Sequence, residues 1–73
     1  MDKLERMERR YRAAEQLTAG AKPGLAMIEA LAGLEELRDR LLGELRDDIR
    51  GAERAGDDKL QWRIQQFLRQ LGG

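Results

Sequence analysis

The fold is decided by residues 25–55, which read LAMIEALAGLEELRDRLLGELRDDIRGAERA. This stretch contains no proline, and its apolar side chains return every three or four positions, the period of an amphipathic helix. We therefore expect one long helix. It would be about 45 Å long, whereas a compact chain of this size is roughly 30 Å across. A helix of that length overhangs the rest of the chain, breaks, or packs against a partner, and we expect the partner to be a second copy of the chain.

Two apolar surfaces are expected on this helix. The main stripe, which should pack in the core, consists of Met27, Leu31, Leu34, Leu41, Leu45, Ile49 and Ala52. Arg38 falls inside it, so Arg38 either pairs with a carboxylate such as Glu35 of a facing helix or extends along the core to reach water. The second strip lies about 100° around the helix, is expected to contact another protein chain, and consists of Leu25, Ile28 and Ala32.

Glycines interrupt the long helix at Gly33, Gly43 and Gly51. Each costs about 1 kcal/mol relative to alanine in a helix interior. Because no proline accompanies them, we expect a continuous helix, bent if anywhere at Gly43. Small residues at Ala26, Ala30 and Gly33 would allow another helix to approach closely.

A first helix is expected over residues 2–18, capped by Asp2. Its apolar seam has the alternating spacing of a coiled coil and consists of Leu4, Met7, Tyr11, Ala14 and Thr18. Gly20 should end this helix, and a loop over residues 19–24, with Pro23 near the start of the next helix, favours an antiparallel hairpin.

A third helix is expected over residues 58–71. Gly56 should end the long helix, and Asp58 followed by Gln61 resembles a capping box. The buried side of the third helix is predicted to consist of Leu60, Ile64, Phe67, Leu68 and Leu71. Trp62 lies on the other side with Gln66 and Arg69, a composition typical of protein interfaces. The alternative is that Trp62 folds back against the Gly56 turn or the end of the long helix.

Composition favours a single all-α domain over residues 1–73. The chain has no cysteine or histidine, which excludes disulfides and the usual zinc sites, and we expect no cofactor. β-Branched residues are too few to build a sheet. Residues 1–10 are charged rather than apolar, and the longest apolar stretch, residues 25–34, is too short for a membrane span. We expect a complete, small cytoplasmic protein.

Few side chains suited to nucleophilic catalysis are present, because serine is also absent and Tyr11 and Thr18 carry the only hydroxyl groups. Residues 34–41, LEELRDRL, faintly resemble the arginine-bearing helix of small chorismate mutases. That resemblance implies a small all-α enzyme as a third hypothesis, but it assigns no catalytic residues. We expect a protein that is not an enzyme.

The function expected first is protein binding by a self-associating helical bundle, most simply a homodimer, acting as a regulator, inhibitor, assembly factor or chaperone-like adaptor. The interface residues predicted for this role are Leu25, Ile28, Ala32, Arg38, Trp62, Gln66 and Arg69. The alternative is a nucleic-acid-binding regulator that contacts phosphates through Arg6, Arg9, Arg10 and Arg12. The net charge of zero makes nucleic acid the less favoured partner.

Overall fold

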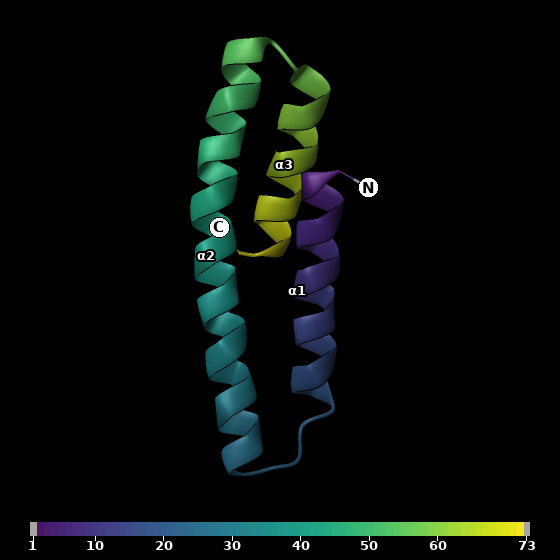
Figure 1. The fold of residues 1–73 in the computed structure, drawn as a ribbon, viewed down its shortest axis with the longest axis vertical. Coiled ribbons are helices and arrows are strands. Elements are labelled where there is room, and N and C mark those ends of the chain that lie inside the picture. Colours follow the sequence, from purple (N-terminus) through teal and green to yellow (C-terminus); the bar gives the residue numbers. More distant parts are fainter. Residues whose placement is uncertain (1, 73) are drawn as a thin grey trace. The chain divides into compact units, whose positions relative to one another are not determined.

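A computed structural model describes residues 2–72, and in that range the chain forms three helices and no strand (Figure 1). These are α1 (Lys3–Ala19), α2 (Leu25–Ala55) and α3 (Asp58–Gln70). The all-α prediction is confirmed, and α2 runs without interruption through its three glycines. The observed helix ends lie within one residue of the expected ends.

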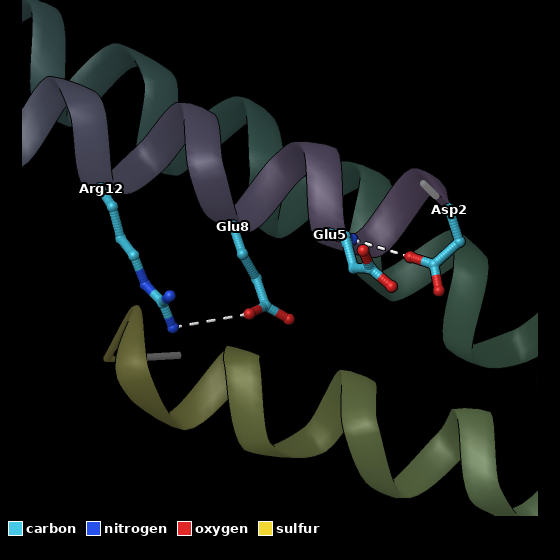
Figure 2. A network of polar contacts seen from close by, with 4 residues as sticks. All are labelled: Asp2, Glu5, Glu8 and Arg12. Carbon is cyan, nitrogen blue, oxygen red and sulfur yellow. Dashed lines mark hydrogen bonds and ion pairs between the residues drawn. The ribbon is translucent and has the colours of Figure 1, made fainter.

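Helix α1 has the expected capping residues, Asp2 and Gly20, and each of its ends lies one residue later than expected. The Asp2 carboxylate accepts a hydrogen bond from the backbone N–H of Glu5 at 2.8 Å, as an N-cap does (Figure 2). At the other end, the Gly20 amide donates to the carbonyl of Gln16 at 3.0 Å. Gly20 has an ordinary φ of −89°, so this helix ends without a left-handed residue.

Helices α2 and α3 are joined by a turn in which one aspartate has two roles. Gly56 adopts a φ of 68°, which glycine accepts more readily than other residues. The Asp57 amide donates to Ala52 O at 2.9 Å and the Gly56 amide to Glu53 O at 3.1 Å, the two bonds of a Schellman motif. The Asp57 carboxylate then accepts from the Leu60 amide at 3.1 Å and caps α3.

The expected cap at Asp58 is therefore wrong. The Schellman motif leaves Asp57 just outside α2, three residues before Leu60, which is the spacing that an N-cap needs. Asp58 is already in the first turn of α3, where its negative charge faces the positive end of the helix dipole.

The chain divides between Asp39 and Arg40 into two compact units. The first contains α1 and residues 25–39 of α2, and the second contains the rest of α2 and α3. Each unit is an antiparallel pair of helical segments (Figure 1). The expectation of a single domain remains a prediction.

In the first unit, the expected seam of α1 is its packing face. Leu4 and Met7 are buried, with 5% and 6% of their surface exposed, and Tyr11, Ala14 and Thr18 are half-buried. The Thr18 hydroxyl lies 2.9 Å from Ala14 O in its own helix and 3.4 Å from the carbonyl oxygen of Ala30 in α2. The second of these contacts ties the two helices together near their connecting loop.

The main stripe needs a correction in the first half of α2. There the half-buried positions are Met27, Ala30, Leu34 and Leu37. Leu31 is 45% exposed and Arg38 is exposed, so neither belongs to the packing face. Apolar residues occupy nearly all sides of this segment, and the period alone could not choose between Ala30 and Leu31. Ala30 is half-buried and its carbonyl oxygen lies 3.4 Å from the Thr18 hydroxyl, so this residue lies beside α1.

The second unit contributes the most deeply buried side chains. Leu45 is 0%, Ile64 1% and Leu41 2% exposed. The remaining buried residues of this unit are Ala52, Phe67 and Leu71. The main stripe is therefore correct from Leu41 onward.

The expected close approach of another helix at Gly33 is not found among residues 2–72. A Cβ atom added there would meet no other atom within 4 Å. Ala26 is exposed, and only Ala30 of the three small residues faces a neighbouring helix.

Candidate protein-binding surfaces

The second strip lies on the outside of the first unit. Leu25 is 70% and Ile28 65% exposed, and Ala32 is also exposed. At about 100° per residue, their mean direction is nearly opposite to that of Met27, Ala30 and Leu34. The second strip therefore points away from α1. It leaves two large aliphatic side chains of one helix in water.

The start of α2 fixes the position of this strip. Gly24 has a φ of 106°, and its carbonyl accepts the Ile28 amide at 3.2 Å. Leu25 is thus the first residue of the helix, and Leu25, Ile28 and Ala32 follow one another along about two turns. The charged residues around them, all exposed, are Lys22, Glu29, Glu35 and Glu36.

Leu17 is an exposed residue that the sequence reasoning missed. It is 75% exposed, the highest value among the exposed large apolar residues that the structure describes. It precedes Thr18 in α1 and so lies about 100° away from the seam. The sequence gives no periodic signal for it, because Ala14 is the only seam residue three or four positions away.

Trp62 forms the centre of a second exposed surface, in the second unit. Its side chain is 62% exposed, so it does not fold back against the Gly56 turn. Gln66 is half-buried and Arg69 exposed, and their spacing of four and seven residues places all three on one side of α3. The structure thus groups the three predicted residues on one surface of α3.

Arg38 occupies a different position from the one expected. It is exposed, because Leu37 takes the place on the packing face that the sequence assigned to position 38. Its guanidinium group needs no buried counter-charge within its own unit.

The arginines of α1 are exposed, but acidic residues lie among them. Arg6, Arg9, Arg10 and Arg12 all face solvent. Arg12 Nη2 lies 3.6 Å from Glu8 Oε2, and Figure 2 shows the two side chains extending toward each other. An ion pair with 63% and 28% of its side chains exposed contributes little to stability, but it reduces the positive charge offered to a phosphate.

The described residues offer few groups for chemistry. Within residues 2–72, no cluster of three or more metal-ligating side chains is present. In the same range, no helix combines the length and the apolar character needed to cross a lipid bilayer.

Comparison with models of protein families, with curated proteins and with solved structures gives no match.

Proposed function

We propose that this chain is a small protein-binding module that works as a homodimer, in which two copies build a helical bundle. The observation that carries the proposal is the second strip, where Leu25 and Ile28 are 70% and 65% exposed on one side of α2. A regulatory or adaptor role in the cytoplasm is part of the same proposal.

The exposed area sets the expected strength of the dimer. Fully burying one leucine or isoleucine side chain contributes about 1.5–3 kcal/mol. Leu25 and Ile28 from two copies give four such side chains, each already about one third covered, or about 4–8 kcal/mol before the cost of association, which is itself at least about 4 kcal/mol. We therefore expect a weak dimer, with a Kd of about 1 mM or above.

The proposal is tested by sedimentation equilibrium at micromolar to millimolar concentrations. Ile28→Glu should convert the dimer to a monomer, because a charge would lie within the apolar contact. Leu17→Glu is the matched control, since Leu17 is also mostly exposed, at 75% against 65% for Ile28, but lies outside the second strip. Both variants should keep the helicity of the parent chain by circular dichroism. A parent chain that stays monomeric throughout would refute the homodimer.

The Trp62 surface, with Gln66 and Arg69, is the proposed contact for a different protein. An exposed tryptophan beside an arginine is a frequent source of binding energy in interfaces. The second strip belongs to the first unit and the Trp62 surface to the second. The two surfaces therefore share no residue, and partner binding by α3 can be tested separately from dimer formation.

Nucleic-acid binding through Arg6, Arg9, Arg10 and Arg12 is the alternative, supported by the exposure of all four side chains. Replacing both Arg9 and Arg10 by glutamate should remove any salt-sensitive binding to DNA or RNA if this alternative holds. Under the protein-binding proposal, the parent chain already binds neither at physiological salt, and the double variant keeps the mass of the parent dimer.

A further inference from the structure

We propose that the second strip docks a basic amphipathic helix of another protein, whose lysines or arginines pair with the carboxylates that continue the strip along α2. The inference rests on the proposed function in treating the second strip as a protein-binding surface. It adds the chemistry of a partner other than a second copy. It uses only residues 25–39, the part of α2 that belongs to the first unit.

The outer side of this segment is apolar at its start and acidic toward its end. Four acidic residues lie within about 70° of the mean direction of the second strip. They are Glu29, Glu35, Glu36 and Asp39, and all four are exposed. At 1.5 Å per residue, the surface from Leu25 to Asp39 is about 21 Å long, which matches a partner helix of about 15 residues.

No basic residue of this segment shares the side of the second strip. Arg38 is the only basic residue between positions 25 and 39, and it lies about 110° from the mean direction of the strip. Lys22 belongs to the loop that leads back to α1, and α1 packs on the opposite side of α2. The next basic residue along the helix, Arg40, lies in the second unit. The apolar contact is therefore bordered by negative charge.

The apolar and acidic residues of this surface have different roles in binding. Leu25 and Ile28, 70% and 65% exposed, supply the apolar area that an amphipathic helix covers. The carboxylates decide which helix can use that area, since charges at a contact govern the choice of partner more than its strength.

The charge of this surface disfavours a second copy and favours a basic partner. Two copies paired through the second strip would each bring four carboxylates to the contact, and like charges repel. A helix with lysine or arginine at the facing positions forms ion pairs instead. Because the dimer is expected to have a Kd of about 1 mM or above, the strip is open to such a partner at micromolar concentrations.

The test uses synthetic helical peptides of 15 residues, with binding followed by fluorescence anisotropy at micromolar protein. Two basic peptides carry three leucines along one side of the first or the last two turns, and three lysines along the same side of the other turns, so that both helix directions are represented. Matched peptides have glutamate in place of lysine. We expect one basic peptide to bind at least about tenfold more tightly than its glutamate counterpart, and to bind more weakly as salt is added.

Two triple variants with the same change in net charge locate the binding site. The strip variant is Glu35→Gln/Glu36→Gln/Asp39→Asn, and the control variant, made at exposed residues of the second unit, is Glu44→Gln/Asp47→Asn/Glu53→Gln. The strip variant should bind the basic peptide about three- to hundredfold more weakly, since three exposed pairs are lost. The control variant should bind it nearly as the parent chain does.

The strip variant should have the opposite effect on the homodimer. Removing three carboxylates from each copy reduces the repulsion, so the dimer Kd measured by sedimentation equilibrium should fall. The apolar part of the contact is tested by Ile28→Ser, which should weaken both the peptide complex and the dimer. Leu17→Ser is its matched control and should weaken neither.

Three outcomes would each overturn the inference: equal binding of the basic and glutamate peptides, no binding of either basic peptide, or the same loss in the strip variant and the control variant. None of them bears on the homodimer, which is judged by the mass of the parent chain. A parent chain that is monomeric at every concentration would refute the homodimer, and the peptide measurements would still decide the inference.

Discussion

Leu45 and Leu17 have the same side chain in opposite surroundings. Leu45 lies fully buried in the second unit, with 0% of its surface exposed, whereas Leu17 is 75% exposed. Leu45→Ala should lower the free energy of unfolding by about 2–5 kcal/mol, because it removes buried methyl groups and leaves a cavity. Leu17→Ala should change it by no more than about 0.5 kcal/mol. Urea unfolding followed by circular dichroism measures both, and equal effects would contradict the described core.

Two adjacent aspartates give a second test at the scale of single residues. The Asp57 carboxylate accepts the Leu60 amide at 3.1 Å, whereas Asp58 interacts with α3 chiefly through the helix dipole. Asp57→Ala should cost about 1 kcal/mol, and Asp58→Ala about 0.3–1 kcal/mol at low salt. Salt distinguishes them, because the dipole interaction of Asp58 is screened while the hydrogen bond of Asp57 persists. If Asp58→Ala is the more harmful change in high salt, the cap has been misassigned.

At the scale of the elements, α2 contains glycines that its structure does not need. Apart from the surrounding backbone of α2, a Cβ atom at Gly43 or Gly51 would meet no atom within 4 Å, and neither residue has a positive φ. Gly43→Ala and Gly51→Ala should therefore each stabilise the chain, by up to about 1 kcal/mol.

Gly56→Ala is the contrasting variant, because the same added methyl group would stand on a residue with a φ of 68°. It should destabilise the chain by about 1 kcal/mol. Thermal unfolding of the three variants measures these opposite signs. A loss of stability at Gly43 or Gly51 would mean that the glycine is required by a contact with another chain.

The helices and their ends could be read from the sequence because local residues decide them. Asp2, Gly20 and Gly56 stop or start helices through their own backbone and side-chain chemistry, and the seam of α1 follows directly from its spacing. The predictions were wrong where two neighbouring residues suited the same role equally well. Asp57 and Asp58 are both good caps, and Ala30 and Leu31 are both apolar, so only the geometry of the turn and the position of Thr18 decide between them.

The candidate site was predictable where apolar residues lie outside the stripe that packs in the core, because the sequence shows such residues directly. The second strip stood out because Leu25 and Ile28 lie outside the main stripe, and both are exposed. Arg38 was placed on the wrong face because position 37 or 38 could continue the stripe. Leu17 was missed because a single leucine beside a regular seam gives no periodic signal of its own.

At the scale of the whole molecule, stability and association are expected to depend on each other. Two copies that associate only when folded stabilise each other by mass action, so the melting temperature should rise with protein concentration. Ile28→Glu should remove that dependence while leaving the melting temperature at low concentration nearly unchanged. Calorimetry over a hundredfold range of concentration measures both. A parent chain whose melting temperature does not change would contradict the homodimer.

The turn at Gly56 and Asp57 also has a kinetic consequence. It joins the C-terminal half of α2 to α3 through two residues, so the contacts of the second unit link positions that are close in sequence. Low contact order of this kind is associated with folding in microseconds to milliseconds. The loop that must close is very short, and its closure costs little chain entropy. Residues 40–72 are therefore expected to form their hairpin early and rapidly, with the Asp57 cap in place as soon as both helices exist.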